Sequence, residues 1–151
     1  MFLTSGYNMS YSPMNMPDMS QFDNVFVDPA AYAAFQTTGT WPDKTVMVLE
    51  PRQGQQKGSI NQEGRFQTDR LGLEVHVKDT ARFAGGWAFF AFGRAEDPGQ
   101  LVPTTAACYS CHAAHAAVDT TFVQFYPILK PIAAARGTFS AAYLHDEAGT
   151  H

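Results

Sequence analysis

The chain has two cysteines, and both lie in the pentapeptide Cys108-Tyr109-Ser110-Cys111-His112. This C-x-x-C-H spacing is the pattern that attaches c-type haem. The two thiols add to the two vinyl groups of the porphyrin, because their offset matches the vinyl spacing when the segment is nearly helical. The neighbouring imidazole then lies under the iron as its proximal ligand. The pentapeptide therefore predicts one covalently bound haem c, held by Cys108 and Cys111, with His112 as the axial ligand.

Two other uses of paired cysteines fit the sequence less well. A redox dithiol also has the C-x-x-C spacing, but it usually opens a helix inside a βαβ unit, which this chain does not suggest. A zinc site would have to combine the two thiolates with His112 and His115. Adjacent cysteine and histidine in one short helix give poor tetrahedral geometry. A dithiol or zinc domain without haem is therefore kept only as an alternative.

The composition excludes several further classes of protein. Ten basic residues and a net charge of −4 leave no electrostatic footprint for nucleic acid. No run of about 18 apolar residues occurs, so no membrane-spanning helix is expected. The 151 residues are the length of one domain, and 12 Phe, 6 Tyr and 2 Trp can supply the apolar walls that a porphyrin needs.

Short runs of apolar and β-branched residues indicate a sheet with a few helices. The runs predict strands at 25–27, 45–50, 70–78, 87–92 and 121–126. Capping signals and alanine content predict helices at 30–36, 105–118 and 131–136. The first helix follows Asp28 as N-cap and Pro29, and it ends before Gly39. Strands do not alternate regularly with long helices. We therefore expect an α+β fold with an antiparallel β-sheet of about four to five strands and short helices, one of which carries the C-x-x-C-H motif.

The segment 70–78 gives the clearest strand pattern, because apolar and polar residues alternate along it. One side carries Leu71, Leu73, Val75 and Val77. The other side carries Arg70, Glu74, His76 and Lys78. The alternation predicts that the apolar side faces the core and that His76 faces solvent.

Three parts are expected along the chain: a flexible or surface-lying segment at 1–21, a single haem domain at 22–139, and a tail without pattern at 140–151. The first residues have neither a basic start nor a long apolar stretch, so they are not a secretory signal. Haem is attached to C-x-x-C-H outside the bacterial cytoplasm. We therefore expect an exported, periplasmic protein whose N-terminus is truncated here.

The side of the iron opposite His112 decides between two functions. A strong sixth ligand makes an electron carrier, whereas an open position makes a site for small molecules. In many electron carriers a methionine downstream of the haem motif closes that position. Here no methionine follows His112, since all six lie at or before Met47. This favours an open site, and a six-coordinate electron-transfer cytochrome c is the alternative.

Several stretches together resemble the cytochrome P-460 family. The most specific is CYSCHAAHAAVDTTFVQFYP at 108–127, preceded by GGWAFF at 85–90. Earlier matches are NVFVDPAAY at 24–32, TGTWPD at 38–43, KGS at 57–59 and EVHVKD at 74–79. The resemblance covers most of 24–138 in order.

The resemblance implies a β-rich periplasmic haem protein, commonly a homodimer, with a five-coordinate iron and a distal pocket. Some members oxidise hydroxylamine and carry a lysine cross-linked to the porphyrin. Others, the cytochrome c-prime-beta branch, lack the cross-link and bind gases such as nitric oxide. The implied partners are thus a small nitrogen-oxide ligand and a redox partner protein.

The position that matches the cross-linking lysine is Leu49, which has no amine. An apolar pocket suits a neutral diatomic ligand better than a substrate that must lose a proton, so hydroxylamine oxidation is left open. On the same argument we predict the distal wall to be Phe22, Phe26, Leu49 and Phe66. No catalytic residue is identified, and Asp119 and Glu50 are candidate bases by type only. Three lysines elsewhere in the chain are candidates for a cross-link, and we interpret them as solvated charges: Lys44, Lys57 and Lys78.

Overall fold

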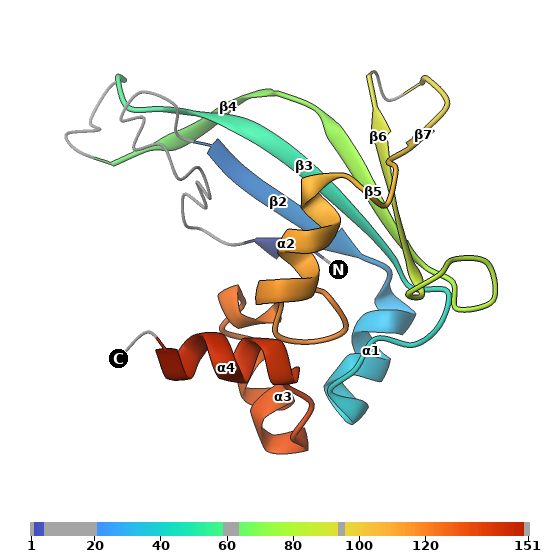
Figure 1. Cartoon of the computed structure of the whole chain (residues 1–151). Coiled ribbons are helices and arrows are strands. Elements are labelled where there is room, and N and C mark those ends of the chain that lie inside the picture. Colours follow the sequence, from blue (N-terminus) through green and yellow to red (C-terminus); the bar gives the residue numbers. More distant parts are fainter. Residues whose placement is uncertain (1, 5–20, 59–63, 94–95, 150–151) are drawn as a thin grey trace.

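The computed structural model describes residues 2–4, 21–58, 64–93 and 96–149. Within them the chain forms one antiparallel sheet and four α-helices (Figure 1), which confirms the expected α+β class. The strands are β1 (Phe2–Thr4), β2 (Gln21–Val27), β3 (Val46–Gln55), β4 (Phe66–Arg70), β5 (Leu73–Lys78), β6 (Trp87–Phe92) and β7 (Gln100–Leu101). The helices are α1 (Pro29–Thr38), α2 (Ala107–His115), the 3-10 helix η1 (Val123–Phe125), α3 (Lys130–Arg136) and α4 (Ala141–Gly149).

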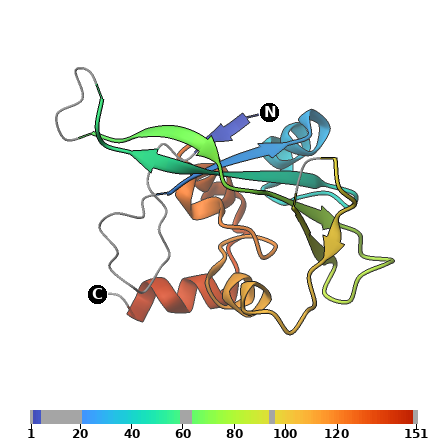
Figure 2. The same ribbon diagram turned by 90° about the horizontal axis from the view of Figure 1, so that it is seen from above.

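The sheet has the strand order β1-β2-β3-β5-β6-β7, and β4 pairs with the outer part of β3. Seven strands take part, because the short strands β1 and β7 add to the longer ones. All four α-helices lie on one side of the sheet (Figure 1). Helices α2 and α4 lie side by side in both views (Figures 1 and 2), so the helix that carries the haem motif is packed between the sheet and the C-terminal helix.

Register determines which side chains face the helices. Val27 pairs with Met47, Met47 with His76, and His76 with Phe89. Directly opposed residues of antiparallel strands share one face of a sheet. These four residues therefore form one row on the helix-covered face, and Val25, Leu49 and Glu74 form the next.

The opposite face of the sheet carries a second apolar row. It runs across five strands through Phe26, Val48, Val75, Phe90 and Leu101. We call these five residues the outer row. No helix lies over it in the described part of the chain (Figure 1), and Phe26 and Leu101 are 37% and 57% exposed. The sheet therefore has apolar residues on both faces.

The predicted caps of helix α1 are confirmed, and the helix is slightly longer than the expected 30–36. The Asp28 carboxylate accepts a hydrogen bond from the Ala31 amide at 2.8 Å, and Pro29 occupies the first turn. Gly39 ends the helix in the left-handed region, with φ of 76°. Inside the fold, Phe35 is fully buried and its ring lies 4.3 Å from that of Trp41.

Two elements near the haem motif differ from the expectation. Helix α2 is shorter than 105–118, because Ala116 is already extended. The segment 121–126 was expected to be a strand and instead contains the 3-10 helix η1. Its β-branched residues are used for burial rather than for strand pairing: Val123 is 1% exposed, and in the described residues the only bridge here joins Val118 to Thr121.

The expected strand 70–78 is interrupted at Gly72, so that β4 and β5 are separate strands. The expected orientation of this strand was also wrong. His76 and Lys78 face the helices, and their side chains are only 13% and 15% exposed. Val75 lies instead on the outer row. The sequence pattern identified the two faces correctly but could not indicate which of them the helices cover.

The expectation of a patternless tail was wrong over 141–149, which forms α4. The Ser140 hydroxyl accepts a hydrogen bond from the Tyr143 amide at 3.0 Å, and the Tyr143 side chain is 3% exposed. Most of the expected N-terminal segment, at 5–20, lies outside the described residues, while β1 pairs with β2. In the described residues no helix has the length and apolar character needed to cross a bilayer.

Candidate functional site

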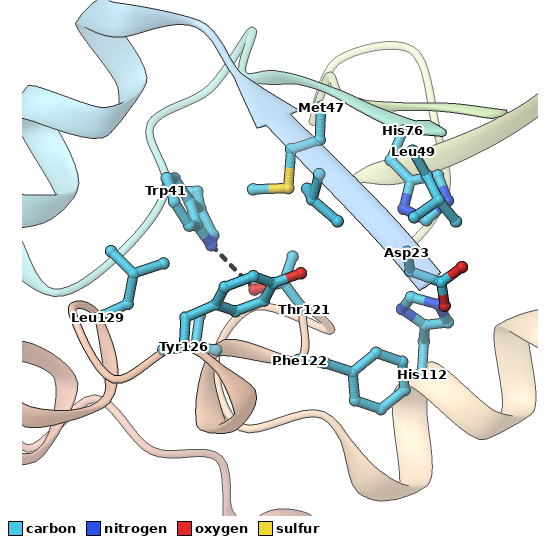
Figure 3. Close-up of a pocket in the computed structure, with 12 residues that line it drawn as sticks. Asp23, Trp41, Met47, Leu49, His76, His112, Thr121, Phe122, Tyr126 and Leu129 are labelled. Atoms are coloured by element: carbon cyan, nitrogen blue, oxygen red, sulfur yellow. Dashed lines mark hydrogen bonds between the residues drawn. The ribbon is translucent and has the colours of Figure 1, made fainter. Parts of the chain in front are cut away.

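A cavity of about 220 Å³ lies between the helix-covered face of the sheet and the segment that follows α2 (Figure 3). Its walls are mostly apolar, with a few polar side chains among them. The lining residues are Asp23, Val25, Trp41, Met47, Leu49, His76, His112, Thr121, Phe122, Val123, Tyr126 and Leu129. Concave, mainly apolar pockets with few polar groups are typical ligand sites.

His112 projects from α2 into this cavity (Figure 3). Its ring lies 4.5 Å from that of Phe122 and 4.8 Å from that of Phe89, measured between centroids. Burial among these rings lowers the pKa of His112 from 6.5 to about 4. The imidazole is therefore neutral at neutral pH, which is the protonation state in which histidine binds a metal.

A hydrogen bond determines which nitrogen of His112 is free. Nδ1 lies 2.7 Å from the carbonyl oxygen of Thr120. A carbonyl oxygen only accepts hydrogen bonds, so Nδ1 must carry the hydrogen and Nε2 must carry the lone pair. This is the arrangement by which proteins orient a metal-binding histidine.

The donor set on α2 fits a covalently attached haem. Cys108 and Cys111 are free thiols on the same helix as His112, with Cys108 exposed and Cys111 partly buried. Residues three apart on a helix lie on one side of it. Paired thiols, a neutral imidazole and an apolar cavity beside it are the features that haem attachment requires. The zinc alternative gains no support, since the described residues contain no group of three or more potential ligands.

The four residues predicted for the distal wall are not brought together. Leu49 lines the cavity (Figure 3). Phe22 and Phe26 do not, because alternation along β2 points Asp23 and Val25 into the cavity and the two phenylalanines to the opposite face. Phe66 lies on β4 and is 42% exposed.

Several cavity residues were missed by the reasoning from sequence. His76 stacks on Phe89, with ring centroids 4.1 Å apart, and its ring meets that of His112 edge-on at 5.4 Å. Met47 lies beside His76 in the register. Given the position of Leu49 at the cavity, the period of two along β3 would have identified Met47, and cross-strand pairing would have identified His76.

Asp23 is the carboxylate at the cavity. Its Oδ1 accepts a hydrogen bond from Gln21 Nε2 at 2.7 Å. Burial raises the pKa of Asp23, the nearby charge of Glu74 raises it further, and the bond from Gln21 opposes them. Neither candidate base named from the sequence lines the cavity: Glu50 pairs with Arg52, and Asp119 is bonded to Lys78 and Trp41.

All four lysines of the chain are among the described residues, and none lines the cavity. Lys44 pairs with Asp79, and Lys57 is exposed, as a solvated charge would be. Lys78 was wrongly interpreted as a solvated charge. Its Nζ donates to the Trp41 carbonyl oxygen at 2.7 Å and to Asp119 Oδ2 at 3.0 Å.

Residues 5–123 match the family model described as Cytochrome P460. No curated protein matched the chain. The matched segment includes the C-x-x-C-H motif, the Leu49 strand and most of the cavity wall.

Proposed function

The chain belongs to the cytochrome P460 family, and from this membership we propose that it is a c-type haem protein with one open axial position, which binds nitric oxide. The family binds haem c, so the cofactor is one covalently bound haem c. When bound, haem c supplies an iron atom that can bind a diatomic gas and change its oxidation state by one electron.

The chain's own residues have separate parts in this proposal. The thiols of Cys108 and Cys111 anchor the porphyrin to α2. His112 supplies Nε2 as the axial ligand, and the Thr120 carbonyl oxygen holds the imidazole through Nδ1. The apolar side chains around the cavity exclude water and leave room for a small uncharged ligand.

The observation that carries the proposal is Leu49 in the wall of the cavity that His112 also lines. In the hydroxylamine-oxidising members of the family, a lysine cross-linked to the porphyrin takes this position. A leucine can form no such bond and makes the wall apolar. An apolar wall favours a neutral diatomic molecule over a substrate that must lose a proton to a base.

The test is a titration of the full-length holoprotein with nitric oxide, followed by its visible absorption spectrum. We expect a five-coordinate ferrous spectrum that changes on addition of the gas. Leu49→Lys should weaken binding by about tenfold or more, because an ammonium group in an apolar cavity is poorly solvated. The matched variant Leu49→Met keeps the wall apolar and should bind as the wild type does. A wild-type protein that does not respond to nitric oxide would contradict the proposal.

Hydroxylamine oxidation is a second candidate, and Asp23 is the observation that favours it. A proton acceptor near the bound nitrogen is needed for that reaction, and Asp23 places a carboxylate at the cavity. If the wild type reduced an electron acceptor in the presence of hydroxylamine, Asp23→Asn should abolish that activity. Retention of full activity by the variant would exclude Asp23 as the base.

The alternative to an open axial position is a six-coordinate haem iron, as in an electron-transfer cytochrome c. Met47 and His76 line the cavity and carry atoms that can bind haem iron. His76 stacks on Phe89 and meets His112 edge-on. Met47 is the better candidate, because a methionine thioether is the sixth ligand that cytochromes c use. A low-spin spectrum that becomes high-spin in Met47→Leu would support this alternative.

We further propose a periplasmic homodimer that exchanges electrons with a redox partner protein. The outer row supports the dimer, because it places apolar side chains on a face that no described helix covers. Attachment of haem to C-x-x-C-H supports the periplasmic location. Haem attachment should accordingly require a secretory leader on the expressed chain, and haem loading without export would contradict the location.

A further inference from the structure

The segment that holds His112 in place has an unusual backbone. Asp119 and Thr120 have φ of 49° and 56°, in the left-handed region. They are the two central residues of a tight turn, closed by a hydrogen bond of 2.7 Å from the Thr121 amide to the Val118 carbonyl oxygen. Turns with two left-handed residues favour Asn-Gly, and a β-branched residue there is a clear outlier. The surroundings must therefore hold this turn.

An ion pair and a backbone hydrogen bond hold the turn from one side. Asp119 Oδ2 accepts from the Trp41 amide at 3.1 Å and from Lys78 Nζ at 3.0 Å. Lys78 also donates to the Trp41 carbonyl oxygen. Since Lys78 is the last residue of β5, this network fastens the turn to the sheet. The side chains of Lys78 and Asp119 are 15% and 29% exposed, so the pair is partly shielded from salt and water.

This turn also carries the carbonyl oxygen that accepts the hydrogen bond from His112. The Thr120 carbonyl oxygen lies 2.7 Å from His112 Nδ1. A good acceptor at this nitrogen fixes the orientation of the ring and makes the other nitrogen a stronger donor. A stronger axial donor stabilises ferric over ferrous iron and so lowers the reduction potential. The quality of this bond depends on the conformation that Asp119 and Lys78 maintain.

We propose that Lys78 and Asp119 are positioning residues for the axial imidazole: their ion pair holds the left-handed turn that offers the Thr120 carbonyl oxygen to His112, and thereby lowers the reduction potential of the haem. This inference rests on the proposed role of His112 as axial ligand. It does not depend on which small molecule the protein binds.

The experiment uses the full-length holoprotein and two readouts, the reduction potential and the iron–histidine stretching band of the ferrous protein by resonance Raman spectroscopy. Asp119→Ala and Lys78→Met should both shift the potential to more positive values and lower the frequency of the band. Asp119→Asn keeps a side-chain oxygen and tolerates the left-handed region, and Lys78→Arg keeps the charge. For both conservative variants, the potential and the band frequency should lie closer to the wild-type values than in Asp119→Ala and Lys78→Met.

Lys44→Met is the control, because Lys44 also forms an ion pair, 2.6 Å from Asp79, but takes no part in the network that holds the turn. It should change neither readout. If Lys78→Met and Asp119→Ala lowered thermal stability but left the band and the potential at wild-type values, a merely structural role would be shown and the inference would be wrong. A wild-type protein that shows the iron–histidine band but does not respond to nitric oxide would overturn only the proposed function.

A wild-type protein without the iron–histidine band would overturn both the proposed function and this inference.

Discussion

The Nδ1 nitrogen of His112 lies 2.7 Å from the carbonyl oxygen of Thr120, a residue whose own φ is 56°. The imidazole thus depends on a backbone conformation that a threonine rarely adopts. This hydrogen bond fixes the tautomer that leaves Nε2 free for iron. The strained turn therefore holds His112 in the tautomer that can bind iron.

The strain at Thr120 can be measured through stability. Thr120→Asn should increase the free energy of unfolding by roughly 1 kcal/mol, since asparagine adopts the left-handed region more readily than a β-branched residue. The carbonyl acceptor belongs to the backbone and is retained. Urea denaturation of the holoprotein gives the change, with Thr37→Asn, an exposed site on α1, as control. A Thr120→Asn protein less stable than the wild type would contradict this account of the turn.

Asp23 predicts a dependence of stability on pH. Burial, with a smaller contribution from Glu74, raises the pKa of Asp23 above that of the unfolded chain, for which 3.8 is the reference value. The unfolded state then releases its proton first as pH rises, so the contribution of Asp23 is complete below pH 3.8 and is lost as pH rises through the folded pKa.

Asp23→Asn removes this loss and keeps an oxygen that can accept from Gln21. The variant should be more stable than the wild type at pH 7 and equally stable near pH 3. Denaturant titrations across this pH range check the prediction, and Asp69→Asn, at an exposed position of β4, is the control. Equal stabilities of variant and wild type at pH 7 would be inconsistent with the raised pKa.

The contact of α1 with the Trp41 loop should carry a large share of the stability. Phe35 is fully buried against Trp41, so Phe35→Ala should cost about 3–5 kcal/mol by loss of burial and creation of a cavity. Leu144→Ala, at a residue that is 52% exposed, should cost far less. Guanidinium unfolding curves compare the two, and similar midpoints would show that Phe35 does not pack in the core.

The outer row predicts the effect of a charge on dimer formation. Val75→Glu places a carboxylate in the middle of that row and should give a monomer by light scattering, because the buried charge would lack a partner. Gln53→Glu adds the same charge on β3 away from the row and should leave the oligomeric state unchanged. An unchanged Soret band and circular dichroism spectrum would show that Val75→Glu is folded. A folded dimeric variant would exclude this face as the interface.

Only part of the candidate site could be predicted from the sequence. Leu49 was placed at the cavity by resemblance, whereas His76 was assigned to solvent because its strand has a polar side. Alternation sorts residues into two faces, but the outer row makes the second face apolar as well. Hydrophobicity therefore gave the wrong answer for β5, and the register with Met47 and Phe89 was needed to correct it.

Features that depend only on neighbouring residues could be predicted from the sequence. The thiol spacing of Cys108 and Cys111, the adjacent His112 and the caps of α1 are local, so covalent geometry and short-range hydrogen bonds fix them. The face of the sheet that the helices cover, and the carbonyl oxygen that holds His112, could be identified only from the folded structure. Those outcomes depend on contacts such as that of Lys78 with Asp119, 41 positions apart, and no local pattern records a contact over such a separation.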